Sequence, residues 1–127
     1  MENKEHYILV THAGIRMLLP SAEIIRAESV GTYTVFYLRN SKEQYVCSRN
    51  IGRVQHELEP GTFFRVHRSH IINLNEIKIF RNARSGKVIL SDNTVITVAQ
   101  RRKTELLNYL RHMNRKLKNE SAPIKKY

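Results

Sequence analysis

The stretch Phe63-Phe-Arg-Val-His-Arg-Ser-His-Ile-Ile-Asn-Leu-Asn-Glu-Ile77 decides the fold of this chain. Apolar and polar residues alternate from Phe64 to His67, which is the two-residue period of a β-strand. The alternation fails at Ser69, where the pattern predicts a turn or two of helix over His70-Ile71-Ile72. Strand periodicity returns at Ile77. We therefore expect two strands joined through a short helical corner.

This corner gathers residues that can bind an oxyanion. Arg65, His67, Arg68 and Ser69 lie within five positions of one another. Guanidinium and hydroxyl groups donate hydrogen bonds to phosphate oxygens, and a rigid corner would limit the loss of side-chain freedom on binding. The stretch therefore predicts phosphate contact, although Arg68 and Ser69 could also be simple solvated corner residues.

The run from Phe64 to Ile77 resembles the most characteristic segment of the LytTR family, the DNA-binding domain of many bacterial response regulators. Three further stretches resemble the family in the same order and at about the same spacing, and they are Glu23–Tyr33, Val88–Thr94 and Val98–Lys103. The resemblance covers roughly Tyr7 to His112. It implies an elongated stack of small antiparallel β-sheets whose loops face DNA.

Periodicity along the rest of the chain predicts a mostly β domain. Asp92-Asn93 predicts a tight hairpin, Asn50 a helix N-cap and Pro60-Gly61 the end of that helix. Strands are expected at 7–11, 15–19, 24–29, 33–38, 44–48, 88–90 and 95–98, and one helical turn at 21–23. The last expected element is an amphipathic helix over Arg101 to Leu117, with its apolar stripe at Leu106, Leu110, Met113 and Leu117.

The length of 127 residues suits one domain, and we place it at residues 7–112. Residues 1–6 form an N-terminal segment, and residues 113–127 form the end of the last helix and a basic tail. The net charge of +11 favours a polyanionic partner. Residues 1–100 hold 13 Lys and Arg against 9 Asp and Glu, whereas residues 101–127 hold 9 against 2.

Several functional classes lack support in the sequence. Cys47 is the single cysteine, which excludes an internal disulfide and a Cys-rich zinc site. His67 and His70 have a spacing that metal ligands use, but no third ligand lies near them in sequence, so we expect neither metal nor cofactor. We recognise no phosphate-binding glycine loop and no catalytic triad, and we expect no enzymatic activity. The chain lacks an apolar run of about 18 residues and a signal peptide, so we expect a cytoplasmic protein.

The resemblance implies roles for residues in three loops. It places Arg68 and Ser69 at the minor groove and backbone, a loop at residues 32–34 in one major groove, and Arg101 in the next. Asn73 is expected to hold the corner together, and Ala99 stands where the family usually has serine. The candidate DNA-binding residues are Thr32, Tyr33, Thr34, Arg65, Arg68, Ser69, Gln100, Arg101, Arg102 and Lys103.

The sequence thus predicts a transcriptional regulator that binds double-stranded DNA with sequence specificity. We expect a monomer or weak homodimer in solution, with two copies on a full DNA site. Only about six residues precede the resembling region, so we expect control by abundance, a partner protein or self-association in place of a receiver domain. Two alternatives remain, namely an RNA-binding domain and an interaction protein that pairs through the helix at residues 106–117.

Overall fold

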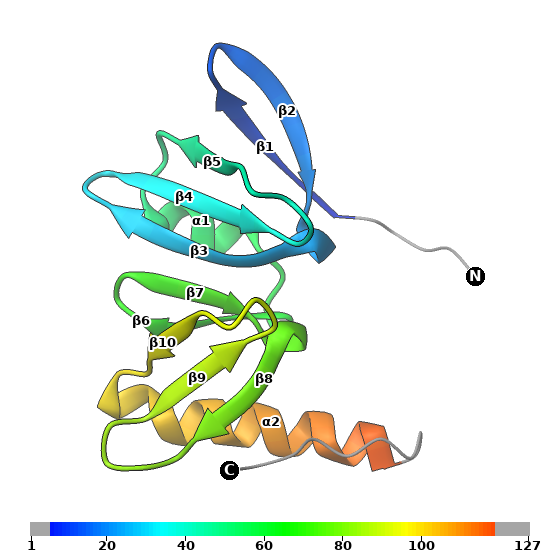
Figure 1. The fold of residues 1–127 in the computed structure, drawn as a ribbon, viewed down its shortest axis with the longest axis vertical. Coiled ribbons are helices and arrows are strands. Elements are labelled where there is room, and N and C mark those ends of the chain that lie inside the picture. Colours follow the sequence, from blue (N-terminus) through cyan, green and yellow to red (C-terminus); the bar gives the residue numbers. More distant parts are fainter. Residues whose placement is uncertain (1–5, 119–127) are drawn as a thin grey trace.

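The computed structural model describes residues 6–118 of the chain, and the side chains of residues 6–113. Over these residues the chain forms an elongated stack of three antiparallel sheets with two α-helices (Figure 1). The upper part holds β1 (Tyr7–His12), β2 (Ile15–Pro20), η1 (Ser21–Glu23), β3 (Ile24–Val30), β4 (Tyr33–Leu38), β5 (Gln44–Cys47) and α1 (Ile51–Glu57). The lower part holds β6 (Phe63–His67), β7 (His70–Asn73), η2 (Leu74–Glu76), β8 (Ile77–Arg81), β9 (Lys87–Leu90), β10 (Val95–Thr97), η3 (Gln100–Arg102) and α2 (Lys103–Lys118).

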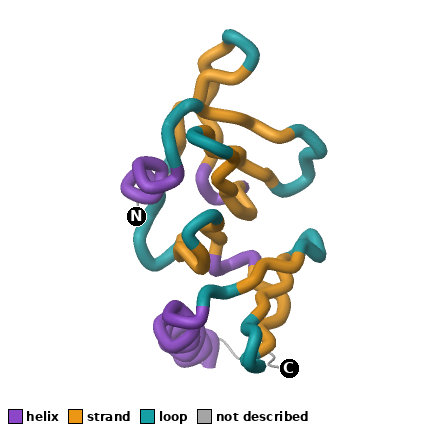
Figure 2. The backbone as a smooth tube through the Cα atoms, turned by 90° about the vertical axis from the view of Figure 1, so that its left-hand side faces the viewer, coloured by secondary structure: helices purple, strands orange, loops and turns teal. Residues whose placement is uncertain are grey.

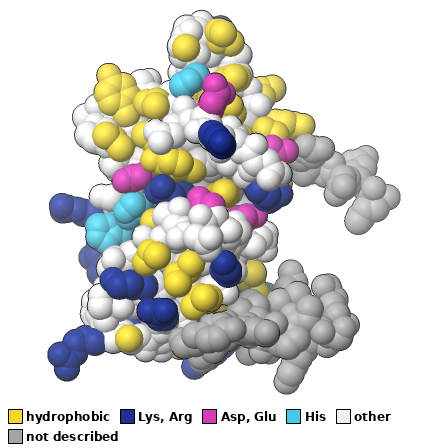
Figure 3. All heavy atoms as spheres, viewed as in Figure 1, with side chains coloured by type: hydrophobic (Ala, Val, Ile, Leu, Met, Phe, Trp, Pro, Cys, Tyr) yellow, Lys and Arg dark blue, Asp and Glu magenta, His cyan; other side chains and the backbone are white. Residues whose placement is uncertain are grey.

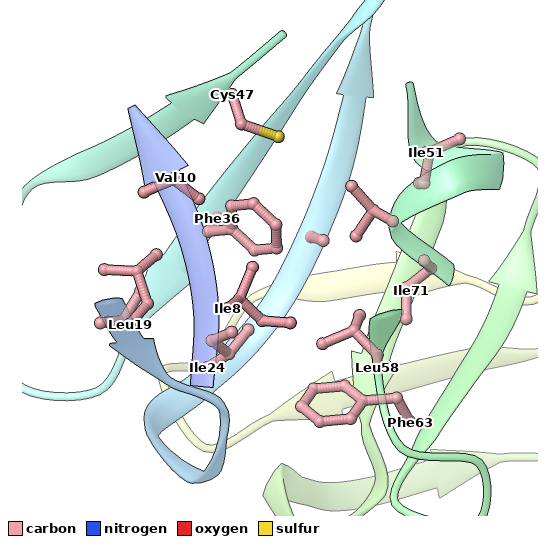
Figure 4. Packing of buried hydrophobic residues seen from close by; sticks show 13 residues of the cluster. Ile8, Val10, Leu19, Ile24, Phe36, Cys47, Ile51, Leu58, Phe63 and Ile71 are labelled. Carbon is pink, nitrogen blue, oxygen red and sulfur yellow. The ribbon is translucent and has the colours of Figure 1, made fainter. Parts of the chain in front are cut away.

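The central sheet has the strand order β5-β4-β3-β7-β6, so β3 pairs with a strand more than forty residues away. Hydrophobic clusters cover both of its faces. On one face, Phe36 packs with Ile8 of the β1–β2 hairpin and with residues of α1 (Figure 4). On the other face, Ile72 and Phe64 pack with the three-stranded sheet β10-β9-β8 and with α2. The central sheet therefore sets the positions of both smaller units.

Several connections between neighbouring strands have positive φ, and the hairpin predicted at Asp92-Asn93 is confirmed. Ala13 and Gly14 join β1 to β2 with φ of 52° and 77°, and Asn93 joins β9 to β10 with φ of 70°. Gly31 has φ of 61° between β3 and β4. Positive φ is a conformation that glycine and asparagine adopt at low energetic cost, which explains the tight connections at Gly14, Gly31 and Asn93 but not the positive φ of Ala13.

Helix α1 also follows its sequence signals. The side-chain oxygen of Asn50 accepts a hydrogen bond from the backbone N–H of Arg53 at 2.9 Å, which is the predicted N-cap. Ile51 and Val54 face the core and are buried. The helix ends at Glu57, shortly before Pro60. The capped helix is thereby fixed against the central sheet.

The helical corner expected at residues 70–72 is wrong. Residues His70–Asn73 form strand β7, and only Arg68 and Ser69 make the turn. β7 is hydrogen-bonded on both edges, to β6 and to β3, and Ile71 and Ile72 enter the clusters on opposite faces of the sheet. A strand buried on both faces shows a continuous apolar run, which resembles a buried helix in sequence.

The C-terminal helix is confirmed, with a displaced start. Residues Gln100–Arg102 form a 3-10 turn, and α2 begins at Lys103. Leu106 is fully buried and Leu110 is 7% exposed, so both pack with Ile72 and Phe64 in what we call the lower cluster, with Met113 partly buried against it. The side chain of Leu117 and the predicted tail at 119–127 lie outside the described residues. Over the described part of the chain, no helix combines the length and apolar character needed to cross a membrane.

Candidate nucleic-acid interface

Three turns lie along one edge of the molecule, at the left of Figure 1 and towards the viewer in Figure 2. They are the β3–β4 turn at Gly31-Thr32, the β6–β7 turn at Arg68-Ser69, and η3. The β3–β4 and β6–β7 turns are coupled, because the amide of Ser29 donates to the carbonyl of Ser69 at 2.9 Å. Figure 3 shows Lys and Arg side chains along the same margin, from the middle of the molecule downwards. The tertiary structure thus collects three of the predicted segments into one basic edge.

The β6–β7 turn is held by its own side chains. The ring Nδ1 of His67 accepts a hydrogen bond from the amide of Ser69 at 3.1 Å. Arg68 is exposed, and its guanidinium has no protein partner among the described residues. The turn therefore presents the Arg68 guanidinium and the Ser69 hydroxyl on a restrained backbone.

Arg65 lies beneath this turn and is partly buried. Its Nη1 donates to the side-chain oxygen of Gln55 at 3.0 Å, and its Nη2 donates to the carbonyl oxygen of Arg68 at 2.6 Å. Burial lowers the pKa of Arg65, and the nearby positive charge of Arg102 lowers it further. Both Nη atoms thus have acceptors within the protein, unlike those of Arg68.

The β3–β4 turn separates three candidates that the sequence left together. Thr32 is exposed, and the Tyr33 side chain is 53% exposed at the start of β4. Thr34 is fully buried, and its hydroxyl donates to the carbonyl of Arg49 at 2.7 Å. The expectation that Thr34 contacts DNA is therefore corrected, because strand alternation turns this side chain towards the interior.

The segment around η3 is anchored to β6, because the amide of Ala99 donates to the carbonyl of Val66 at 2.8 Å. Ala99 is the N-cap of η3 and forms no side-chain cap bond, as expected where alanine replaces a hydroxyl residue. Gln100 and Arg101 are exposed. The Arg101 guanidinium has no protein partner among the described residues.

The two remaining basic candidates of this segment are already engaged. Arg102 forms an ion pair with Glu105 at 3.3 Å. The ammonium of Lys103 donates to the carbonyls of Ala83 at 2.6 Å and Arg84 at 3.4 Å, and so closes the β8–β9 loop onto α2. Arg101 is thus the basic side chain of this segment that remains available for a ligand.

A polar cluster behind the β6–β7 turn was missed by the sequence interpretation. The guanidinium of Arg26 lies 3.8 Å from the ring centre of Tyr37 and donates to Glu28 at 3.1 Å. The hydroxyl of Tyr37 donates to the same Glu28 oxygen at 3.3 Å, and Glu28 lies opposite His70 across β3 and β7. Burial lowers the pKa of His70 most, Glu28 raises it, and Arg26 and His67 lower it. The alternation Arg26-Ala27-Glu28 is the signal that could have revealed the cluster.

The ring centres of His67 and His70 lie 5.6 Å apart, because the two residues pair across the β6–β7 hairpin and not because they share a helical turn. His67 uses Nδ1 for the Ser69 amide. Among the residues whose placement is described, no group of three or more His, Cys, Asp or Glu side chains could hold a metal ion. Asn73 holds the corner as predicted, because its amide donates to the carbonyl of Ile24 at 2.9 Å and its oxygen accepts the amide of Asn75 at 2.9 Å.

Residues 15–111 match the family model of the LytTr DNA-binding domain. The chain belongs to the LytTr DNA-binding domain family. The matched residues include β2 to β10 and most of α2, and so contain all three turns of the basic edge. As a LytTr domain, the chain is a DNA-binding module, which confirms the expectation of a DNA partner.

Individual relatives extend the comparison. The chain is 37% identical over 75 residues to the transcriptional regulatory protein YpdB of Escherichia coli K12, and an equal match is found in Shigella flexneri. The match covers 59% of this chain and 27% of the relative, so the chain spans about a quarter of the length of the curated relatives that it matches. A solved LytTr domain of a protein described as a methyl-accepting/DNA response regulator from Bacillus cereus has the same fold. That structure superposes with a TM-score of 0.72 at 16% identity, over 85% of this chain and 98% of the other.

The two alternatives from the sequence gain little from the structure. The apolar residues of α2 that would pair with a partner helix, Leu106 and Leu110, are buried in the lower cluster. Single-stranded RNA is often bound by neighbouring exposed aromatic residues on one sheet. The exposed tyrosines of the described region, Tyr7 and Tyr33, belong to different sheets.

Proposed function

We propose that this protein binds duplex DNA with sequence preference and regulates transcription, using the basic edge formed by the three turns. Thr32 and Tyr33 enter one major groove and Arg101 enters the next. Arg68 and Ser69 contact the minor groove and the backbone between them. Base edges in the major groove present distinct donor and acceptor patterns, so two loops in successive major grooves can read sequence.

The observation that best supports this proposal is the contrast between engaged and unengaged arginines at the basic edge. Arg65 and Arg102 donate to protein acceptors, whereas Arg68 and Arg101 are exposed and have none among the described residues. Exposed guanidinium groups without protein acceptors keep their donors for phosphate or guanine. The relationship to a transcriptional regulatory protein supports the same function.

The proposal includes assembly on DNA. The protein is a monomer or weak dimer in solution and binds a full site as two copies, each reading one repeat. The apolar stripe of α2 is used in packing at Leu106 and Leu110, which favours a monomer in the absence of DNA. Sedimentation should give a monomer or weak dimer without DNA, and a tight dimer would contradict this part.

Selection of bound duplexes from a random pool tests the function directly. We expect an enriched sequence that occurs as a repeat. The binding constant for it should fall steeply with salt, by about 0.9 log units per log unit of salt for each phosphate neutralised. Equal affinity for all duplexes at physiological salt, or binding that does not respond to salt, would refute the proposal.

A further inference from the structure

A polar link joins helix α1 to the β6–β7 turn through a single side chain. Gln55 of α1 accepts from Nη1 of Arg65, and Nη2 of the same guanidinium donates to the Arg68 carbonyl. We infer that Arg65 is a positioning residue, which holds the Arg68-Ser69 turn against α1 and does not itself contact DNA. This inference rests on the proposed function, since the turn matters only if it reads DNA.

The geometry gives the link its stiffness. A guanidinium is planar, so its two Nη donors have a fixed relative direction, and bonds to two different elements fix the orientation between those elements. The α1 end of the link is anchored, because Ile51 and Val54 are buried in the same hydrophobic cluster as Ile8 and Phe36. At the other end of the link, Arg65 donates to the backbone carbonyl of Arg68, whose own guanidinium belongs to the proposed DNA-binding surface.

The engagement of the Arg65 donors also favours a positioning role over phosphate contact. Both acceptors of Arg65 are neutral oxygens, and its Nε is buried without a hydrogen-bond partner among the described residues. Arg65 and Arg102 line one pocket of about 280 Å³ between α1 and α2. A phosphate that drew the Arg65 guanidinium outwards would take it away from the acceptors that now hold the turn, so DNA contact there would release the turn that reads it.

Substitutions of the two side chains test the link on the duplex obtained by selection. Arg65→Lys keeps the charge but loses the fork, and we expect about tenfold weaker binding, which corresponds to about 1.4 kcal/mol. Gln55→Ala carries no charge change and should weaken binding to the preferred duplex in the same direction. Binding of both variants to random duplex should change by less than about twofold, as expected when only a specific contact is misplaced.

Two further variants, Arg65→Met and Arg53→Met, complete the set. Arg53→Met is the matched control, because Arg53 is an exposed arginine of α1 whose side chain has no partner among the described residues. Arg65→Met should lose specific affinity with an unchanged salt slope. Arg53→Met should lower the affinity for the preferred duplex and for random duplexes by the same small factor. Thermal unfolding of each variant establishes that it is folded. Because Gln55 is exposed, Gln55→Ala removes the link without removing a buried side chain.

Opposite results would overturn the inference. Arg65→Lys with wild-type affinity, together with a slope reduced by about 0.9 in Arg65→Met, would make Arg65 a phosphate contact. Wild-type specific binding in Gln55→Ala would show that the link has no influence on reading. Failure of the proposed function is a separate result, because it would be seen in the wild-type protein as equal affinity for all duplexes.

Discussion

Arg39 and Glu76 form an ion pair across the junction between the upper and lower parts of the molecule, with Nη2 and Oε2 2.7 Å apart. Nη2 of Arg39 also donates to the carbonyl of Ala22, and the other oxygen of Glu76 accepts the hydroxyl of Ser91 at 2.5 Å. The Glu76 side chain is only 8% exposed, so this carboxylate depends on its protein partners for hydrogen bonds. The pair joins the end of β4 to η2, and the Ser91 hydroxyl connects Glu76 in turn to the β9–β10 turn.

Glu76→Gln should therefore destabilise the protein by about 1–3 kcal/mol, because it removes a charged acceptor from two hydrogen bonds. The matched control is Glu105→Gln, which breaks the exposed Arg102–Glu105 pair and should cost less than about 1 kcal/mol. Urea denaturation measures both. Equal losses for the two variants would show that the junction adds nothing beyond a surface ion pair.

Tyr33→Ala should reduce discrimination between duplexes without a large loss of stability, because the tyrosine is 53% exposed. An exposed substitution of this kind usually changes the free energy of unfolding by less than about 0.5 kcal/mol. Binding assays on the preferred duplex and on single-base variants would detect the change. Unaltered preference at every position would remove Tyr33 from the reading surface.

Thr34→Val should show the reverse behaviour. The buried hydroxyl of Thr34 donates to Arg49, so its removal leaves that carbonyl with one bond fewer and should cost about 1 kcal/mol of stability. Sequence preference should stay unchanged in the folded variant. A changed preference at wild-type stability would place Thr34 at the DNA after all.

Arg101→Ala should weaken binding to the preferred duplex by about 1–3 kcal/mol, and binding to random DNA much less. An arginine can donate two parallel bonds to guanine O6 and N7, which the ammonium of a lysine cannot reproduce. Arg101→Lys should therefore also lose discrimination. Arg68→Ala should have an intermediate effect, since the minor groove distinguishes little beyond A·T from G·C.

Arg16→Ala provides the control for the Arg101 series, because Arg16 is an exposed arginine of β2 outside the proposed surface. We expect at most a small and equal loss for all duplexes. If Arg101→Ala and Arg16→Ala reduce specific and random binding by the same ratio, the reading residue has to be sought elsewhere.

Stability should fall as the pH is lowered below about 6.5, the ordinary pKa of histidine. Burial first, and then Arg26 and His67, lower the pKa of His70 in the folded state, against the opposing effect of Glu28. The unfolded chain therefore binds this proton at higher pH than the folded protein, so stability is complete above about 6.5 and is lost towards the lower folded pKa. His70→Gln should reduce this loss, measured by urea denaturation at pH 7.5 and 5.5. A pH dependence identical to wild type would exclude His70 as its source.

Local sequence signals anticipated several elements whose geometry depends on neighbours in the chain. Asn50 capped α1, Gly14 and Asn93 closed hairpins, and Leu106 and Leu110 marked the buried side of α2. These signals act through backbone conformation or helical period over a few residues, so they can be read without knowledge of the fold. The resemblance of residues 64–77 to the LytTR family extended this to the DNA-binding function.

Long-range pairing decided the remaining features. His70–Asn73 became a strand because β3 and β6 supply hydrogen bonds on both of its edges, and nothing in the local pattern announces a partner more than forty residues away. The same pairing brought the Ser69 carbonyl to the amide of Ser29. The basic edge carries four arginines with the same side chain: Arg65, Arg68, Arg101 and Arg102. The folded chain places acceptors near Arg65 and Arg102, which stabilise the structure. Among the described residues it places none near Arg68 and Arg101, which remain available to a ligand. The acceptors of Arg65 and Arg102 lie only three to ten residues away in the sequence, but which acceptor each guanidinium reaches depends on the geometry of the folded turns and helices, so the sequence alone could not assign these roles.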